Sequence, residues 1–191
     1  MNSEATRHFR AFLDALGLTP EIDAELERTP QRFATMMAEM SAGISAAPPV
    51  LSVFGVTSAN HEAHSGPIVL LGLPFSSLCV HHLVPFFGTI DVAYVADEQM
   101  VGFGSIGRVI DHFAARPQVQ ERLVAEIADY LASHLKPRGL LVRCRARQLC
   151  MELRGAKKRG TLVSFAARGS LCEGELRQEL IAQFSSAQQP L

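Results

Sequence analysis

The chain has no tryptophan and only two tyrosines among its 191 residues, and charged residues make up just 19% of it. No apolar run approaches the roughly 18 residues that a membrane-spanning helix needs. The net charge of -1 provides no electrostatic attraction for nucleic acid. Because hydrophobic residues still make up 48% of the chain, the composition favours a globular protein with apolar surface for subunit contacts.

Cysteine is also scarce, and its four positions are irregularly spaced: Cys79, Cys144, Cys150 and Cys172. The stretch MNSEATRHFRAFLDALG at the N-terminus is charged throughout. It has neither the apolar core nor the small-residue cleavage site of a signal peptide. We therefore expect a cytoplasmic protein whose cysteines are free thiols or metal ligands rather than a disulfide framework.

The pattern of residues divides the chain at about residue 66, and we expect residues 67–191 to form a single structural unit. The preceding residues 1–66 read as N-terminal helices followed by a long connection. Ser3 is positioned to cap the first helix, and Thr29 to cap another that has Pro30 at its first position. There is no internal repeat and no low-complexity segment.

The second part of the chain alternates between strand and helix patterns. Apolar, β-branched and aromatic residues predict buried strands over residues 67–73 and 84–95. Helical periodicity follows from Ser105 and again from Pro117. Strands return at 140–151 and 161–169, before a last helix over 173–184. This order predicts an α+β fold, an antiparallel sheet with a helical pair on one face. We expect other copies of the chain to bury the opposite face.

Side-chain alternation in the strand over residues 140–151 places Gln148 and Cys150 on one face. Three arginines, at positions 143, 145 and 147, then share the other face. Together with Lys157 and Lys158 they form a basic cluster, which is either an ordinary solvated hairpin or a source of charge for an anionic ligand.

Cys79 and His82 stand in C-x-x-H spacing, close enough for one turn to direct a thiolate and an imidazole to a single ion. Cys150 can supply a third ligand from a distant strand if the two hairpins lie side by side. Three protein ligands leave a position open for water, which is typical of catalytic zinc. From spacing alone, a buried cysteine beside two hydrogen-bonded histidines is the more common arrangement.

Four motifs of the chain resemble, in the same order, those of the GTP cyclohydrolase I family. CVHHLVPFFG is similar to the family's C-E-H-H, VGFGSIGR to V-G-L-S-K-x-x-R, and QLCMELRG to H-x-C-x-x-x-R-G, while RPQVQERL matches at all of its positions. The likeness runs from TPQR, at residues 29–32, to about residue 170. It implies the tunnelling fold (T-fold), pentameric rings stacked as a decamer, active sites between subunits, and hydrolysis at C8 of a guanine nucleotide.

The resemblance also implies a role for particular residues. Cys79, His82 and Cys150 correspond to the zinc ligands, and His81 to the histidine that works in the proton transfers. The residues expected to bind substrate are Glu121 and Gln120 at the guanine edge, Arg32, Arg108 and Arg154 around the phosphates, and Ser105 in the phosphate segment. Without the motif, Glu121 reads equally as part of a solvated helix face.

Five positions depart from the family pattern. Gln148, a catalytic candidate, stands where the family has a histidine, and glutamine cannot deliver a proton. Val80 replaces the glutamate between the cysteine and the first histidine. Gly104-Ser105 replaces the S-K pair, and Thr35 replaces a lysine, so the phosphate pocket has two fewer positive charges.

Our leading hypothesis is a zinc-dependent hydrolase that opens the imidazole ring of a guanine nucleotide at C8. We expect it to stop at a formamidopyrimidine or at the pyrimidine left after formate release, and to use fewer phosphates than GTP carries. One alternative is an ordinary GTP cyclohydrolase I that forms 7,8-dihydroneopterin triphosphate and formate, with another group such as His112 replacing the lost histidine. A second is a non-catalytic oligomer that binds purines or pterins.

Overall fold

The computed structural model describes residues 3–55 and 66–186, and the chain divides into two compact units, Met1–Ala42 and Gly43–Leu191. The predicted division at residue 66 comes directly after residues 56–65, which lie outside the described residues. A division into parts 1–66 and 67–191 therefore stays a prediction.

The first unit is helical, and its elements are α1 (Ser3–Ala15), the 3-10 helix η1 (Ala24–Arg28) and α2 (Thr29–Met40). The rings of Phe9 and Phe33 stack with their centroids 3.8 Å apart, which joins α1 to α2. The prediction that Thr29 caps α2 is wrong. Because η1 runs directly into α2, the capping position falls one residue earlier, on Arg28, while Pro30 does occupy the first turn.

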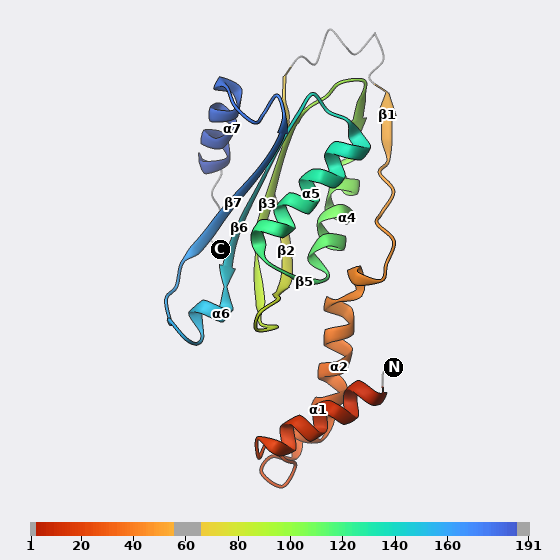
Figure 1. Ribbon diagram of the computed structural model, residues 1–191, viewed down its shortest axis with the longest axis vertical. Helices are drawn as coiled ribbons and strands as arrows, with labels where there is room; N and C mark the ends of the chain where they lie inside the picture. Colours follow the sequence, from red (N-terminus) through yellow and green to blue (C-terminus); the bar gives the residue numbers. More distant parts are fainter. Residues whose placement is uncertain (1–2, 56–65, 187–191) are drawn as a thin grey trace. The chain divides into compact units, whose positions relative to one another are not determined.

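The second unit is built on a five-stranded sheet with the order β5-β2-β3-β6-β7 (Figure 1). All neighbouring strands are antiparallel except the short parallel pair of β2 and β5. The strands are β2 (Ile68–Cys79), β3 (Pro85–Val95), β5 (Pro117–Gln118), β6 (Gly139–Gln148) and β7 (Thr161–Gly169), with a separate pair of β1 (Val53–Gly55) and β4 (Gln99–Val101).

Helices cover both faces of this sheet. The remaining elements are η2 (Ala42–Ile44), α4 (Phe103–Ala114), α5 (Gln120–Leu135), α6 (Leu149–Glu152) and α7 (Glu175–Ser186). Ile90 and Val142 point to the α4 and α5 side and belong to the main core, whereas Leu141 packs on the other side in a cluster with Phe184 of α7. The α+β plan with a helical pair on one face is confirmed. α7 covers part of the opposite face, and burial of the rest by other copies of the chain stays a prediction.

Two predicted boundaries near the candidate site are also wrong. β2 continues to Cys79 rather than ending at residue 73, because Gly72 takes a positive φ of 71° in a bulge and donates its N–H to Asp91. Pro117 does not begin a helix. Its backbone and that of Gln118 pair with the end of β2, so α5 begins only at Gln120.

The strand predicted over residues 140–151 is shorter than expected. β6 ends at Gln148, and Cys150 lies on the single helical turn α6. Strand alternation therefore does not relate these two side chains. Within the described residues, no helix is both long and apolar enough to span a membrane.

Candidate active site and metal centre

The end of β2 and the turn after it carry the first part of the candidate site. Leu83 adopts a positive φ of 52°, and its N–H donates to the carbonyl of Cys79 over 2.8 Å. The N–H of Cys79 in turn donates to the carbonyl of Val84, directly before β3. This tight reversal brings the side chains of His81 and His82 back over the Cys79 sulfur.

The three predicted metal ligands come together in the structure. Ligand atoms of Cys79, His82 and Cys150 all lie within 4.8 Å of one another. The Cys79 Sγ to His82 Nδ1 distance is 3.8 Å, near the roughly 3.6 Å that separates sulfur and nitrogen around a tetrahedral zinc ion. Cys79 is buried and His82 is exposed. The donor set therefore fits a zinc ion that is held from one side and open to solvent on the other.

The Cys150 thiol is perturbed by its surroundings, including the neighbouring Cys79. Burial raises the pKa of the Cys150 thiol, and a hydrogen bond with Cys79 and the charge of Cys79 raise it further. The nearby Arg154 acts in the opposite direction. A bound divalent cation would reverse this balance, because metal ligation requires the thiolate.

His81 lies beside the cluster but outside the three-ligand group. Its Nδ1 is 3.8 Å from Cys79 Sγ, and its ring centroid is 6.3 Å from that of His82. The side chain is exposed. It therefore lies next to the candidate metal ligands with access to solvent.

Gln148 is the last residue of β6 and pairs with Phe86 of β3. Its side chain contacts that of Gln120. Its Nε2 donates to Gln120 Oε1 over 2.9 Å. Gln120 is 2% exposed. Its Nε2 faces three oxygens, the carbonyls of Cys144 and Leu162 and the hydroxyl of Ser164. Both amide hydrogens of Gln120 are thus engaged within the protein, although the residue had been expected to read the base.

Glu121, the next residue, is exposed in the first turn of α5. A carboxylate near a helix N-terminus is favoured by the helix dipole and is free to accept hydrogen bonds. Burial raises the pKa of the Cys144 thiol, and the charges of Asp91 and Glu121 contribute. Glu121 directly follows Gln120, the residue whose side chain accepts from Gln148.

The candidate phosphate-binding residues differ in their exposure. Arg108 and Arg154 are exposed, whereas Ser105 is 1% exposed. The Ser105 hydroxyl accepts from the backbone N–H of Ser52 and from Arg108, over 3.0 and 2.8 Å. In this structure Ser105 orients an arginine. Arg32 belongs to the first unit, where it lines a pocket with Ala24, Glu25, Glu27 and Arg28.

Comparison with known proteins identifies the family of this site. A model of the GTP cyclohydrolase I family matches residues 5–185. The chain is 39% identical to GTP cyclohydrolase 1 of Saccharolobus islandicus over 171 residues, covering 87% of this chain and 82% of the relative. It is 40% identical to GTP cyclohydrolase 1 of Streptococcus mutans over 174 residues, covering 89% and 88%.

The chain belongs to the GTP cyclohydrolase I family. This confirms three predictions: the resemblance to the family, the tunnelling fold and the assignment as a hydrolase of this family.

Two solved structures resemble the chain weakly. An archaeosine synthase QueF-like protein in the apo form aligns with a TM-score of 0.40 and 13% identity, over 52% of this chain and 92% of that one. A putative dihydroneopterin aldolase from Vibrio cholerae aligns with a TM-score of 0.41 and 10% identity, over 55% and 99%. Neither similarity adds to the family assignment.

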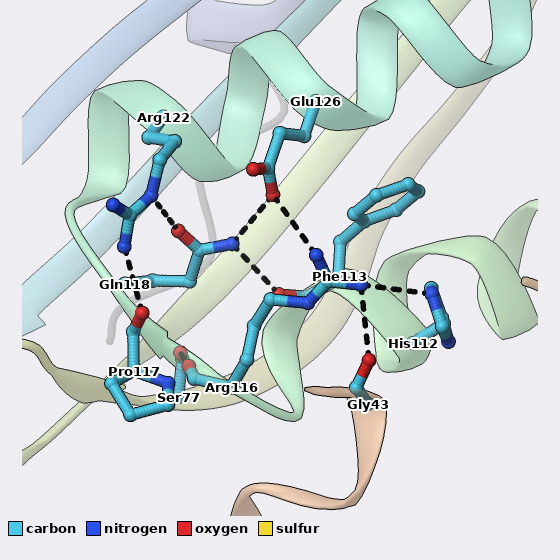
Figure 2. A network of polar contacts seen from close by, with 9 residues as sticks. All are labelled: Gly43, Ser77, His112, Phe113, Arg116, Pro117, Gln118, Arg122 and Glu126. Carbon is cyan, nitrogen blue, oxygen red and sulfur yellow. Dashed lines mark hydrogen bonds and ion pairs between the residues drawn. The ribbon is translucent and has the colours of Figure 1, made fainter. Parts of the chain in front are cut away.

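Sequence reasoning missed the structural role of the motif RPQVQERL (Figure 2). Gln118 is fully buried, and its Nε2 donates to the carbonyl of Phe113 and to Glu126 Oε2. Arg122 donates to Gln118 Oε1 and to the carbonyl of Pro117. These bonds tie the end of α4 and the strand β5 to the first turns of α5. They hold Gln120 and Glu121 in place, and the only sequence signal for them was the complete match of the motif.

His112 belongs to the same network. Its Nε2 lies 2.9 Å from Arg116 NH2, which also donates to the carbonyl of Gly43 (Figure 2). Burial and the charge of Arg116 lower the pKa of His112. A neutral ring that accepts from an arginine is a structural group, so this contact gives His112 a role outside the metal cluster.

Proposed function

We propose that this protein is a zinc-dependent hydrolase that opens the imidazole ring of a guanine nucleotide at C8. The observation that carries the proposal is the convergence of Cys79, His82 and Cys150 in a member of the GTP cyclohydrolase I family. Two thiols and an imidazole suit zinc, which in catalytic sites binds three protein ligands and a water.

A zinc ion at this site would supply a hydroxide at neutral pH. Glu121 would hold the guanine by accepting from N1–H and the exocyclic amine, because an ionised carboxylate has only acceptors. His81, exposed beside the cluster, would carry the proton released as oxygen bonds to C8. With a proton taken up at N7, the C8–N9 bond then breaks, the proton of the new C8 hydroxyl passes to N9, and C8 remains on N7 as a formamide.

We propose that the reaction stops at this formamidopyrimidine or after formate is released. The position of the family histidine is held by Gln148, which cannot donate or accept a proton at ordinary pH. Loss of a general acid–base group costs about 10²–10⁴ in rate for each step that depends on it. Ring opening retains His81, whereas the later steps have lost their nearest proton carrier.

We also propose a substrate with fewer phosphates than GTP. Three arginines, Arg32, Arg108 and Arg154, are the candidate phosphate ligands, and both lysine positions are lost. Each charge-assisted hydrogen bond to a phosphate is worth about 1.5–3 kcal/mol. Two missing lysines would therefore weaken binding of a triphosphate more than that of a mono- or diphosphate.

The second candidate is an ordinary GTP cyclohydrolase I that forms 7,8-dihydroneopterin triphosphate and formate. The observation in its favour is identity of 38–40% to proteins that bear the name GTP cyclohydrolase 1. His112 is a poor replacement for the lost histidine, because it is held by Arg116. A non-catalytic binder is disfavoured by the intact cluster.

Incubation of the zinc-loaded protein with GTP, GDP, GMP and guanosine, followed by mass spectrometry, tests these functions. The expected first product has the mass of the nucleotide plus one water, and release of formate from it gives the second. Dihydroneopterin triphosphate as the main product would favour the ordinary cyclohydrolase. If the protein holds about one zinc per chain and no substrate is altered, both enzymatic functions are refuted and the non-catalytic binder remains.

We propose pentameric rings stacked as a decamer, in the cytoplasm. The sheet face opposite α5 supports an oligomer, because Val163 and Phe165 on β7 are 45% and 40% exposed there. Apolar side chains in a row on one face favour a subunit contact. Analytical ultracentrifugation gives the mass directly, and a monomer at micromolar concentration would contradict the assembly.

A further inference from the structure

The amide of Gln120 has only one orientation that satisfies its surroundings. Its Nε2 lies 3.3 Å from the carbonyl oxygen of Cys144 and 3.1 Å from that of Leu162. Carbonyl oxygens only accept, so a reversed amide would place oxygen against oxygen in a buried site. The hydroxyl of Ser164, 3.1 Å away, is a third acceptor on the same side. Gln120 Oε1 must therefore face away from β6 and β7.

That oxygen meets the side chain of Gln148. The distance from Gln148 Nε2 to Gln120 Oε1 is 2.9 Å. If Gln148 were reversed, two carbonyl-type oxygens would stand at this distance and repel each other. The β6–β7 pair thus sets the orientation of Gln120, and Gln120 sets that of Gln148. One N–H and the Oε1 of Gln148 have no partner among the described residues.

We propose that Gln120 is a positioning residue, which fixes the amide of Gln148 so that its free Oε1 and N–H read the opened ring of the substrate. The identity of that ligand rests on the proposed function. The imidazole ring of a closed guanine offers only the N7 acceptor. The formamide made by ring opening has an N–H donor and a C=O acceptor in its place. A fixed amide complements both groups. Gln148 is then a specificity-determining residue that favours the opened form.

This assignment differs from a direct role of Gln120 at the base edge. A residue that reads the base affects the preference for guanine over hypoxanthine, because these two bases differ by the exocyclic amine. A positioning residue affects only what Gln148 does. The two roles therefore predict different results when both glutamines are replaced.

The test is a double-variant cycle with zinc-loaded wild type, Gln120→Met, Gln148→Met and the double variant, and with Gln178→Met on α7 as the exposed control. Calorimetry compares the affinities for GDP, IDP and a formamidopyrimidine nucleotide. We expect each single variant to weaken binding of the formamidopyrimidine about tenfold, as for loss of a hydrogen bond to a fixed partner. The double variant should be no weaker than Gln148→Met, and the GDP to IDP ratio should stay within about twofold throughout.

Effects of the two single variants that multiply, or a collapse of the GDP to IDP ratio in Gln120→Met, would overturn the inference. Urea unfolding tests the fixed orientation of the two amides, on which the inference depends, without any ligand. Residue 148 is half-buried. Gln148→Glu is expected to unfold at lower urea than Gln148→Met at pH 7, since it places a carboxylate against Gln120 Oε1. An equal or higher midpoint would also overturn it. If instead no guanine nucleotide binds the wild type, the proposed function fails while the unfolding result still stands.

Discussion

Replacement of Gln148 by histidine is the sharpest test of where the reaction stops. Residue 148 must donate to Gln120 Oε1, which lies 2.9 Å away. An imidazole N–H can make the same bond, and the second ring nitrogen is then left to exchange a proton with the substrate. The structure thus already contains the acceptor that would orient an introduced imidazole.

The expected gain follows from the role of an acid–base group. Restoration of one such group is worth about 10²–10⁴ in the dependent step, or roughly 2.7–5.4 kcal/mol of barrier. Gln148→His should therefore raise formate release and pterin formation by that factor, with ring opening changed little. The cost in stability should stay below about 1.5 kcal/mol, because the side chain is half-buried and keeps its hydrogen bond.

The assay follows ring opening by mass spectrometry, formate by a coupled dehydrogenase and pterin by fluorescence in the same reaction. Gln148→Asn is the matched control, since it shortens the amide without adding an acid–base group. If the wild type already makes pterin and Gln148→His changes its rate by less than about twofold, another residue supplies the proton and the reasoning fails.

Four further predictions address the metal, the base, the core and pH. Cys150→Ser should reduce bound zinc from about one per chain to a small fraction by metal analysis, and retention of full zinc would contradict the cluster. Glu121→Gln should lower the ratio of the affinities for GDP and IDP by at least about tenfold in calorimetry, because it loses a charge-assisted acceptor. Asp91→Ala should cost about 3–5 kcal/mol in urea unfolding, since it leaves Arg143 buried without its carboxylate; a cost under about 1 kcal/mol would show that the pair is solvated. The lowered pKa of His112 predicts that the free energy of unfolding is unaffected above about pH 6.5 and falls as pH drops below it, because the unfolded chain binds the proton first. His112→Gln should flatten that part of the pH profile.

Much of the fold was readable from periodicity. β3 begins within a residue of its predicted start, and α5 was identified by its apolar stripe. The errors fall where backbone pairing competes with local signals. The first strand was predicted to end at residue 73, yet β3 supplies enough partners for β2 to continue across a bulge. Pro117 read as a helix start, yet the end of β2 captures it in a parallel pair.

The arrangement of the candidate site was likewise predicted only in part. The sequence predicted Cys79, His82 and Cys150 together only through the family motifs, because spacing alone cannot bring two distant strands side by side. It also gave a wrong reason for Cys150, which reaches the cluster from a helical turn rather than by strand alternation. Gln120 was expected to bind the guanine base. A motif does not show that its side chain is buried.

The sequence by itself determined the helical and strand periods, the α+β class, the family, and the loss of a histidine at position 148. These are properties of composition, spacing and local order. Only the tertiary structure decided which polar atoms are already occupied. Hydrogen-bond partners such as those of Gln120, Ser105 and His112 come from segments far apart in the chain. A residue's chemical role depends on which of its donors and acceptors remain free after those partners are met.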